Sequence, residues 1–320
     1  MPATIGSPLL WAIFAVVIVV MLALDLGVFH RREHIIGTRE AATWVAVWIG
    51  LSLAFDLWIY LQFGTRLALE FLTGYLIEYA LSVDNIFVFI VIFGYFAVPK
   101  TYQHRVLFWG ILGAVVMRGL FIGLGTALIV RFEWVLYLFG AFLVVTGARV
   151  LAHRGTEVHP ERNPVVNLLR RLMPITRGYH GKHFFWREAG RLKATPLLVV
   201  LLVVETTDVV FAVDSIPAIF GVTRDPFLVF TSNIFAILGL RALYFMLSGM
   251  MDRFHLLNVG LGLVLVFIGL KMLAADFVHV SIQLSLAVVV LLLEGRVMAS
   301  LLSPRPAGDD PPPAAGPGTP

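Results

Sequence analysis

Apolar runs of about 20 residues recur along nearly the whole of this 320-residue chain. A helix of about that length spans the hydrocarbon core of a bilayer. The chain is 59% hydrophobic and only 14% charged, whereas about a quarter of the residues in a soluble domain are charged. We therefore predict an all-α polytopic membrane protein that forms one membrane domain.

The hydropathy pattern predicts about nine transmembrane helices within residues 1–302. They are expected at about 8–29, 41–63, 71–97, 107–130, 133–152, 196–220, 228–250, 255–275 and 280–302. The remaining residues, 303–320, include seven prolines. A segment of this composition buries little apolar surface, so it is predicted to be a disordered tail.

The distribution of Lys and Arg predicts the orientation. The longest polar segment, residues 153–195, carries nine Lys or Arg against three Glu, and loops rich in Lys and Arg stay on the cytoplasmic side. Alternation of the spans then places the N-terminus outside and the C-terminus in the cytoplasm. The first span has no preceding Lys or Arg and is followed by Arg31 and Arg32. We therefore expect a retained helix and not a cleaved signal peptide.

The polar segment contains one stretch with a helical pattern, "NPVVNLLRRLMP" at residues 163–174. Asn163 is suited to cap a helix, Pro164 to its first position, and apolar residues recur opposite Arg170 and Arg171. This favours a short helix on the membrane surface, although a solvated linker is the alternative because the stretch is short. The histidines of the segment have no metal-ligand spacing and are expected in a solvated loop: His153, His159, His180 and His183.

The chain also contains an internal repeat. "LSVDNI" at 81–86 is echoed by "FAVDSI" at 211–216, "GILGAVVMRG" at 110–119 by "NIFAILGLRA" at 233–242, and "GAFLVVTGARVL" at 140–151 by "GLVLVFIGLKML" at 262–273. The three matches occur in order, with offsets of 130, 123 and 122 residues. Repeat one is therefore expected at about 71–152 and repeat two at about 196–275.

Each repeat holds three spans, so the second copy must run through the membrane in the opposite direction to the first. Inverted repeats are a recurring plan of secondary transporters, whose binding site lies near the bilayer midplane where equivalent helices meet. Acids mark equivalent positions in the two copies. Glu78 precedes Asp84 by six residues, as Asp208 precedes Asp214.

Charged side chains at the bilayer centre cost about 3 kcal/mol each even on lenient scales, which points to a function for these acids. Glu78, Ser82 and Asn85 fall on one face of a helix, with Asp84 about 120° away. In the other copy, Pro217 removes the hydrogen bond to the carbonyl of Val213. The helix is therefore expected to break near Asp214 and to free that carbonyl as an ion ligand.

We predict a cation site made of oxygen ligands. Its candidate metal ligands are Glu78, Asp84, Asn85, Glu205, Asp208, Asp214 and Ser215, supported by Ser82, Arg118, Asn233, Arg241 and Pro217. The chain has no cysteine, and an oxygen-rich site favours a hard divalent cation such as manganese, calcium or magnesium. Protons are expected to neutralise the carboxylates when the metal leaves. The alternative is structural, with the acids pairing with Arg118 and Arg241 to hold the bundle together.

Other signals exclude or weaken competing functions. No ATP-binding motif, nucleic-acid-binding motif or basic face is present, and no prosthetic group is expected. An intramembrane aspartyl protease would fit two acids on separate helices, but the chain lacks a GxGD sequence, so we do not expect an enzyme. Asp25 and Asp56, outside the repeats, are expected to line a vestibule or to cap neighbouring helices.

Four stretches of the chain closely resemble the TerC family of integral membrane proteins. They are "LDLGVFHR" (24–31), "LTGYLIEYALSVDNIFVF" (72–89), "VPKTYQHRVLFWGILGA" (98–114) and "VVETTDVVFAVDSIPAIF" (203–220). The resemblance implies a helical protein of the bacterial inner membrane, linked to tellurite resistance and to manganese or calcium homeostasis. It also implies that Glu78, Asp84, Asp208 and Asp214 form the ion site. The Pro-rich tail lies outside the family pattern.

The leading expectation is a secondary exporter of a divalent cation, most of all Mn²⁺, driven by protons passing through the same carboxylates. Its partners would be the bilayer, the metal ion and protons. The alternative is a membrane scaffold that assembles a stress-response or tellurite-resistance complex, binding protein partners through residues 153–195.

Overall fold

The computed structural model of the chain describes residues 4–29, 37–152, 163–188, 190–248, 257–278 and 280–302. Eleven helices and one two-stranded sheet occur in these ranges. The helices are α1 (Pro8–Phe29), α2 (Thr38–Phe63), α3 (Thr65–Tyr95), α4 (Lys100–Arg131), α5 (Val135–Ala152), α6 (Pro164–Leu172), α7 (Pro196–Phe220), α8 (Pro226–Leu238), α9 (Leu240–Leu247), α10 (Leu257–Leu273) and α11 (Ile282–Leu302). The strands are β1 (Phe185–Glu188) and β2 (Arg191–Ala194).

The structure confirms a helical membrane protein. Within the described residues, six helical segments are long and apolar enough to cross a membrane: Thr38–Phe63, Thr65–Tyr95, Lys100–Arg131, Val135–Ala152, Pro196–Phe220 and Pro226–Leu247. Three further apolar helical stretches are shorter: Pro8–Ala23, Val259–Leu273 and Ile282–Gly295. Each of the nine predicted spans thus coincides with apolar helix.

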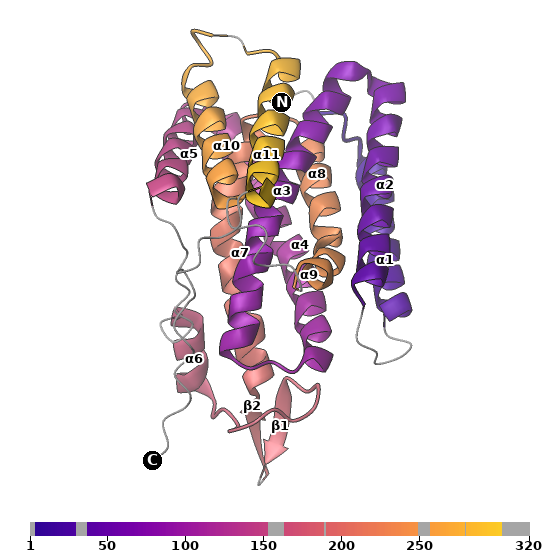
Figure 1. Cartoon of the computed structure of the whole chain (residues 1–320), viewed down its shortest axis with the longest axis vertical. Helices are drawn as coiled ribbons and strands as arrows, with labels where there is room; N and C mark the ends of the chain where they lie inside the picture. The colour runs from indigo at the N-terminus through magenta and orange to yellow at the C-terminus, as the bar shows by residue number, and fades with distance from the viewer. Residues whose placement is uncertain are drawn as a thin grey trace.

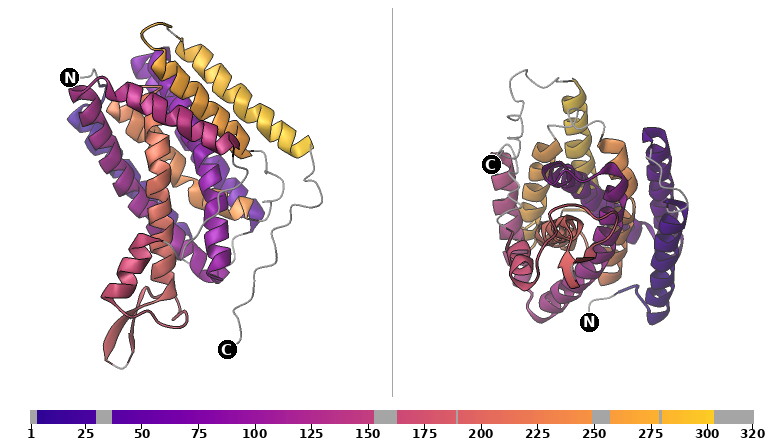
Figure 2. Two further views of the ribbon diagram at one scale, coloured as in Figure 1. Left: turned by 90° about the vertical axis from the view of Figure 1, so that its left-hand side faces the viewer. Right: turned by 90° about the horizontal axis from the view of Figure 1, so that it is seen from below.

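The helices run roughly parallel or antiparallel in an elongated bundle (Figure 1). α3, α4, α7 and α8 pack against one another in its centre, and the segment formed by α8 and α9 is almost completely buried. α1 and α2 lie on one side of this centre, whereas α5, α10 and α11 lie together on another (Figure 2). The bundle therefore has its core where the predicted repeats meet.

Helices α5 and α10 pack closely because glycines face each other across their contact. A Cβ added at Gly140 would lie 3.0 Å from the carbonyl oxygen of Gly269, and one added at Gly269 would lie 2.6 Å from that of Gly140. Gly147 and Gly262 make the same reciprocal contact, at 2.7 and 3.1 Å. Pairing of Gly140 with Gly269 and of Gly147 with Gly262 means that the two helices run in opposite directions.

The expected break near Asp214 does not occur. α7 is one continuous helix from Pro196 to Phe220 with Pro217 inside it. Pro217 and the next three residues are buried, so tertiary packing holds the helix together despite the lost hydrogen bond. Val213 is 44% exposed, which places this residue on an outward side of α7. Pro217 still cannot donate a hydrogen bond to the Val213 carbonyl, so the role of that carbonyl as an ion ligand stays a prediction.

The seventh predicted span comprises two helices instead of one. α8 ends at Leu238, α9 begins at Leu240, and Gly239 joins them at φ −80° and ψ −10°. Trp48 of α2 packs beside this joint, because a Cβ added at Gly239 would lie in ordinary contact with it, 3.4 Å from the Cβ of Trp48. α8 itself begins as its sequence suggests, because Asp225 caps the amide of Phe227 and Pro226 follows the cap.

The polar segment is folded over its described part. Asn163 caps α6 by accepting from the amides of Val165 and Val166, which confirms the short helix although not its placement on a membrane surface. β1 and β2 then form a hairpin that projects beyond the helices (Figures 1 and 2). Tyr179 donates a 2.7 Å hydrogen bond to the carbonyl of Phe96, just after α3. We call this end of the bundle the hairpin end.

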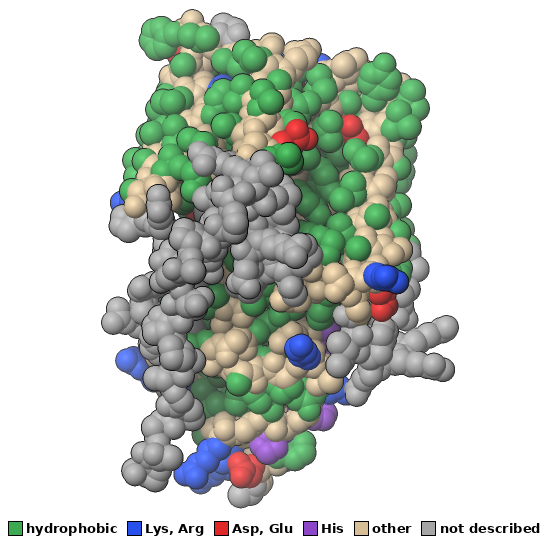
Figure 3. All heavy atoms as spheres, viewed as in Figure 1, with side chains coloured by type: hydrophobic (Ala, Val, Ile, Leu, Met, Phe, Trp, Pro, Cys, Tyr) green, Lys and Arg blue, Asp and Glu red, His purple; other side chains and the backbone are tan. Residues whose placement is uncertain are grey.

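The surface agrees with a bilayer environment. Exposed apolar side chains occur along the spanning helices, including Leu61, Leu120 and Leu291. In the view of Figure 3 they cover the upper part of the molecule, whereas Lys, Arg and His gather at the hairpin end. We call the opposite end, where α3 begins and α7 ends, the far end.

Candidate functional site

An arginine lies at the centre of the bundle. Arg118 of α4 is 0% exposed, and its guanidinium contacts acids from two other helices. Its Nη2 lies 3.1 Å from Oδ1 of Asp208 in α7, and its Nε lies 3.4 Å from Oδ2 of the same carboxylate. This two-pronged geometry is the strong form of an arginine–carboxylate ion pair.

Glu78 of α3 completes the ion pairs around Arg118. The Nη1 of Arg118 donates to Oε1 of Glu78 and also to Oδ1 of Asn233 in α8, the latter at 3.1 Å. Asn233 in turn donates from Nδ2 to Oε2 of Glu78 at 3.0 Å. Ser82 donates to Glu78 at 3.4 Å. Four helices therefore hold one buried network, which we call the Arg118 cluster: Glu78, Ser82, Arg118, Asp208 and Asn233.

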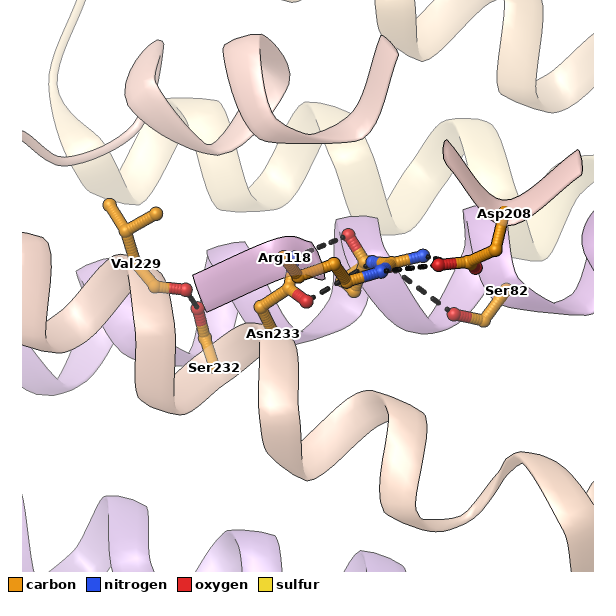
Figure 4. Close-up of polar contacts among 7 residues, drawn as sticks. Ser82, Arg118, Asp208, Val229, Ser232 and Asn233 are labelled. Atoms are coloured by element: carbon orange, nitrogen blue, oxygen red, sulfur yellow. Dashed lines mark hydrogen bonds and ion pairs between the residues drawn. The ribbon is translucent and has the colours of Figure 1, made fainter. Parts of the chain in front are cut away.

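The sequence places these residues together in a simple way. Glu78 and Ser82 are one turn apart on α3, as the helical spacing predicts. The other members come from α7 and α8, which pack against α3, and from α4, which packs against α7 and α8. Figure 4 shows the guanidinium of Arg118 between the side chains of Asn233 and Asp208. Within the described residues, the structure thus brings together Glu78 and Asp208, the acids at equivalent positions of the predicted repeats.

A small buried cavity lies beside the cluster, on its side toward the hairpin end. It is lined by Phe89, Leu107, Gly110, Ile111, Ala114, Val204, Asp208 and Leu240. Asp208 is the one charged residue in this lining. A cation that reached this cavity would therefore meet the carboxylate of Asp208 as its first charged ligand.

Glu205 lies near the same cavity but outside the cluster. Its carboxylate occupies the space beside Gly113 of α4, where an added Cβ would collide with both carboxylate oxygens. Glu205 is one turn from Asp208 on α7, and the charges of the two interact. Gly113 therefore makes room for a second acid close to the cavity.

Asp214 occupies a different position from Asp208. Its side chain forms a hydrogen bond with Thr146 of α5. Its repeat equivalent, Asp84, has a side chain outside the described residues. The neighbours of these acids, Asn85 and Ser215, are buried, and neither Asn85 Nδ2 nor Ser215 Oγ has a hydrogen-bond partner among the described residues.

The remaining predicted residues are placed as follows. Arg241 is the second residue of α9 and is 1% exposed, and its equivalent Arg118 is likewise buried. Thr206 and Thr207, which follow Glu205 on α7, donate to carbonyls of their own helix. Asp56 is half-buried in α2, and its Oδ1 has no hydrogen-bond partner in the part of the chain that the structure describes. The side chain of Asp25 lies outside the described residues.

No ready-made metal cage is present in the described part of the chain. No group of three or more His, Cys, Asp or Glu residues lies close enough there to hold an ion. The Arg118 cluster offers two carboxylates, one amide oxygen and one hydroxyl, with the guanidinium between them. A cation would have to replace Arg118 as the counter-ion of these acids.

One polar cluster was not anticipated. Near the far end, Glu70 of α3 accepts from Thr223 at 2.6 Å and from Nε of Arg66 at 3.0 Å. Asp225 accepts from the hydroxyl of Thr4 and the amide of Ile5. Glu70 immediately precedes the predicted third span. The hydropathy of the sequence gives no sign that a charged residue at such a border is buried.

Residues 63–307 match the Integral membrane protein TerC family. The chain belongs to the TerC family. It is 52% identical over 304 residues to "Uncharacterized membrane protein STKORF319" of Myxococcus xanthus, which covers 95% of each chain. It is 51% identical to "Putative membrane-bound redox modulator Alx" of Escherichia coli K12 (89% of this chain, 92% of that protein).

A more distant TerC relative, "Uncharacterized membrane protein" of Rickettsia bellii, is 37% identical over 91% of this chain and 97% of its own. No solved structure matches the chain. The resemblance that the sequence motifs indicated is therefore confirmed at the level of the family.

Proposed function

We propose that this TerC protein is a secondary transporter that exports a divalent cation, Mn²⁺ first, in exchange for protons. Its cargo binds at the carboxylates of the Arg118 cluster, and its role is in metal homeostasis and tellurite resistance. It crosses the bacterial inner membrane nine times, with the N-terminus outside and the C-terminus in the cytoplasm.

The observation that carries this proposal is the pairing of Glu78 and Asp208 around a fully buried arginine. Structural packing alone requires no acids at equivalent positions of two repeats. A cavity that reaches one of those acids, Asp208, is unnecessary for a structural ion pair. Both features are useful in a site that must be loaded from one side.

The electrostatics suggest how loading works. Two carboxylates and one guanidinium leave the Arg118 cluster with a formal charge of −1. A divalent cation binding to both carboxylates would compete with Arg118, whose displacement disrupts the links between α3, α4 and α7. Protons neutralise the same carboxylates when the metal leaves, because unpaired buried charges are costly. Metal and protons are therefore mutually exclusive ligands.

The ligand chemistry favours a hard cation. Carboxylate, amide and hydroxyl oxygens suit Mn²⁺, Ca²⁺ and Mg²⁺ better than softer metals. The chain has no cysteine, so any redox effect of the kind that the name of its E. coli relative mentions would not come from thiols of this chain. A redox effect that acts through the concentration of a transported metal requires no thiol in this chain.

An inverted repeat supports transport by alternating access. The repeat alignment makes Gly140 equivalent to Gly262 and Gly147 equivalent to Gly269. The observed contacts join Gly140 to Gly269 and Gly147 to Gly262, which is the reciprocal pattern that a two-fold axis produces. α5 and α10 pack as such an axis requires, and rocking of one unit against the other would move the site between the two sides.

The test is ion flux into sealed vesicles containing the purified protein. We expect Mn²⁺ flux that increases with a pH gradient, smaller flux of Ca²⁺ and Mg²⁺, and loss of flux in Glu78→Gln and Asp208→Asn. Glu188→Gln, which alters an exposed carboxylate of the hairpin, is the matched control. Absence of flux for all three ions from correctly inserted wild-type protein would overturn the proposal.

One observation favours a scaffold as a second candidate. The hairpin presents the apolar side chains of Phe185 and Leu192, which are 49% and 55% exposed, at a projecting end rich in Lys and Arg. A scaffold would use this surface and not the buried acids. Tellurite tolerance that survives Glu78→Gln together with Asp208→Asn, but is lost on Phe185→Ser, would support it.

A further inference from the structure

The two sides of the Arg118 cluster are packed differently. Toward the hairpin end lies the cavity that Asp208 lines. Toward the far end, α3 meets α7 and α8 without room for one further carbon atom. A Cβ added at Gly74 would lie 3.0 Å from Oγ of Ser232 and 3.4 Å from both Ile219 Cγ2 and Ser232 Cβ. The site in this conformation is therefore closed toward the far end.

The repeat alignment relates these two sides to each other. It makes Val204, which lines the cavity, equivalent to Gly74 at the closed contact. Phe89 in the cavity is equivalent to Ile219 at the same contact. The tightly packed side toward the far end is therefore the counterpart, in the other repeat, of the side that holds the cavity.

If the two repeats exchange conformations, the cavity must close and its counterpart must open. Ile111 and Ala114 of the cavity correspond to Ile234 and Ile237, and Asp208 corresponds to Glu78. Ile234, Ile237 and Glu78 are all 0% exposed. The exchange would bring them into contact with water.

We propose that the contact between Gly74 and Ser232 is the far-side gate of the transporter. On opening it creates an exit path for the cation, lined by Ile219, Ile234 and Ile237 and leading from Glu78. Glycine at position 74 allows α3 to touch α8 closely enough to exclude water in the closed state. The hydrogen bond from Thr223 to Glu70, at 2.6 Å, joins the same two repeats farther out and opens with the gate. This gate rests on the proposed transport function.

The gate can be locked by a disulfide. The distance of 3.4 Å between a hypothetical Cβ of Gly74 and the Cβ of Ser232 is close to the range of about 3.5–4.5 Å found in disulfides. The chain contains no other cysteine. Gly74→Cys together with Ser232→Cys should therefore form one defined bond on oxidation, reversible with dithiothreitol, and each single variant is its control.

Accessibility of Ile237→Cys to a membrane-impermeant maleimide tests the gate without requiring transport. The exposed positions Glu133→Cys and Arg187→Cys mark the far end and the hairpin end. Ile237→Cys should react only from the far side. It should react about 10- to 1000-fold more slowly than Glu133→Cys, because a minor conformation is commonly populated at about 0.1–10%.

Adding the oxidised pair to Ile237→Cys should abolish that labelling, and dithiothreitol should restore it. Labelling from the hairpin side, absence of labelling from both sides, or labelling unaffected by the disulfide would each overturn the gate. Ala114→Cys, at the equivalent cavity position, should react only from the hairpin side and should keep reacting when the disulfide is formed.

Flux separates the gate from the proposed function. Reduced Gly74→Cys/Ser232→Cys protein should carry Mn²⁺, and oxidation should remove the flux. Unchanged flux after verified oxidation would disprove the gate and leave transport standing. Absence of flux from wild-type protein would disprove Mn²⁺ transport, and the labelling results would still decide whether the gate opens.

Discussion

Arg118 and Asp208 lie 90 positions apart in the sequence and are joined by two hydrogen bonds in the centre of the bundle, at 3.1 and 3.4 Å. The pair links α4 of one predicted repeat to α7 of the other. Arg118 also holds Glu78 and Asn233. The same side chain therefore stabilises the resting fold and occupies the position of the expected cargo.

Removing this guanidinium should be costly. Arg118→Ala leaves Glu78 and Asp208 buried without their counter-ion, and breaking a buried pair costs about 3–5 kcal/mol. We expect a clear fall in the midpoint of thermal unfolding of the purified protein. Arg118→Lys should recover only part of the loss, because a lysine cannot present a fork to the carboxylate.

A double-mutant cycle identifies the partner. Asp208→Asn added to Arg118→Ala should cost less than the sum of the two single changes, because the unpaired carboxylate is then absent. Additive losses would show that the two side chains do not stabilise each other.

Gly113→Ala should displace the carboxylate of Glu205. The new Cβ would collide with the end of a flexible side chain, so the fold should tolerate the change while Glu205 moves. If Glu205 contributes to cation loading, KM for Mn²⁺ flux should rise about tenfold, equivalent to about 1.4 kcal/mol. Gly123→Ala on the same helix meets nothing within 4 Å and should leave KM unchanged.

Gly147→Ala should destabilise the contact between α5 and α10. Its Cβ would lie 2.7 Å from the carbonyl oxygen of Gly262 and 2.9 Å from the amide nitrogen of Val266. The backbone atoms cannot move aside without separating the helices, so we expect a cost of about 1–3 kcal/mol. Thermal unfolding measures it, with Gly123→Ala again as the control. An unchanged midpoint would show that the two helices adjust freely.

Tyr179 should anchor the hairpin segment in a pH-dependent way. Burial raises the pKa of Tyr179 to about 12, whereas a tyrosine in an unfolded chain titrates near 10. The contribution of this residue to stability is therefore complete below about pH 10 and is lost as the pH rises toward 12. The absorbance difference between wild type and Tyr179→Phe, followed with pH, should show tyrosinate forming well above pH 10. Its formation near pH 10 would contradict the buried hydrogen bond.

The same substitution should loosen the hairpin segment at neutral pH. Tyr179→Phe removes the hydrogen bond to Phe96, worth about 1 kcal/mol. Amide exchange of residues 173–195 should become faster. Exchange in α3 upstream of Phe96 is the internal control.

The pattern of apolar residues was sufficient to predict the helices and the helical membrane class. The acids at equivalent positions of the two predicted repeats were sufficient to predict two residues that meet in the candidate site, Glu78 and Asp208. Four candidates on separate helices, Glu78, Arg118, Asp208 and Asn233, meet in one cluster. Such long-range meetings follow from equivalence between repeats, because equivalent helices pack at a shared centre.

Local chemistry was a poorer guide to details of the helices. Pro217 suggested a break, but one missing hydrogen bond is tolerated where the surrounding packing is tight. A single glycine within an apolar run, Gly239, gave no sign that the seventh span would consist of two helices. The pairing of Asp214 with Thr146 depends on how α5 lies against α7, and no spacing within either helix contains that information.

The hairpin was missed because its strands have only four residues each. Its one sequence signal is Gly190, which has φ of +77° at the turn, a conformation that glycine adopts easily. Charged residues on both strands hid the alternation that normally marks a strand.

The reciprocal contacts of Gly140 with Gly269 and of Gly147 with Gly262 are those that two copies of one three-helix protein would make. Such an ancestral half would have to enter the membrane in both orientations in equal amounts, which requires nearly balanced Lys and Arg on its two sides. Joining the halves removes that restriction. The link can then carry a strong positive charge, and residues 153–195, with nine Lys or Arg, do so. In this chain, we therefore expect the connection between the halves to determine the orientation in which the protein is inserted.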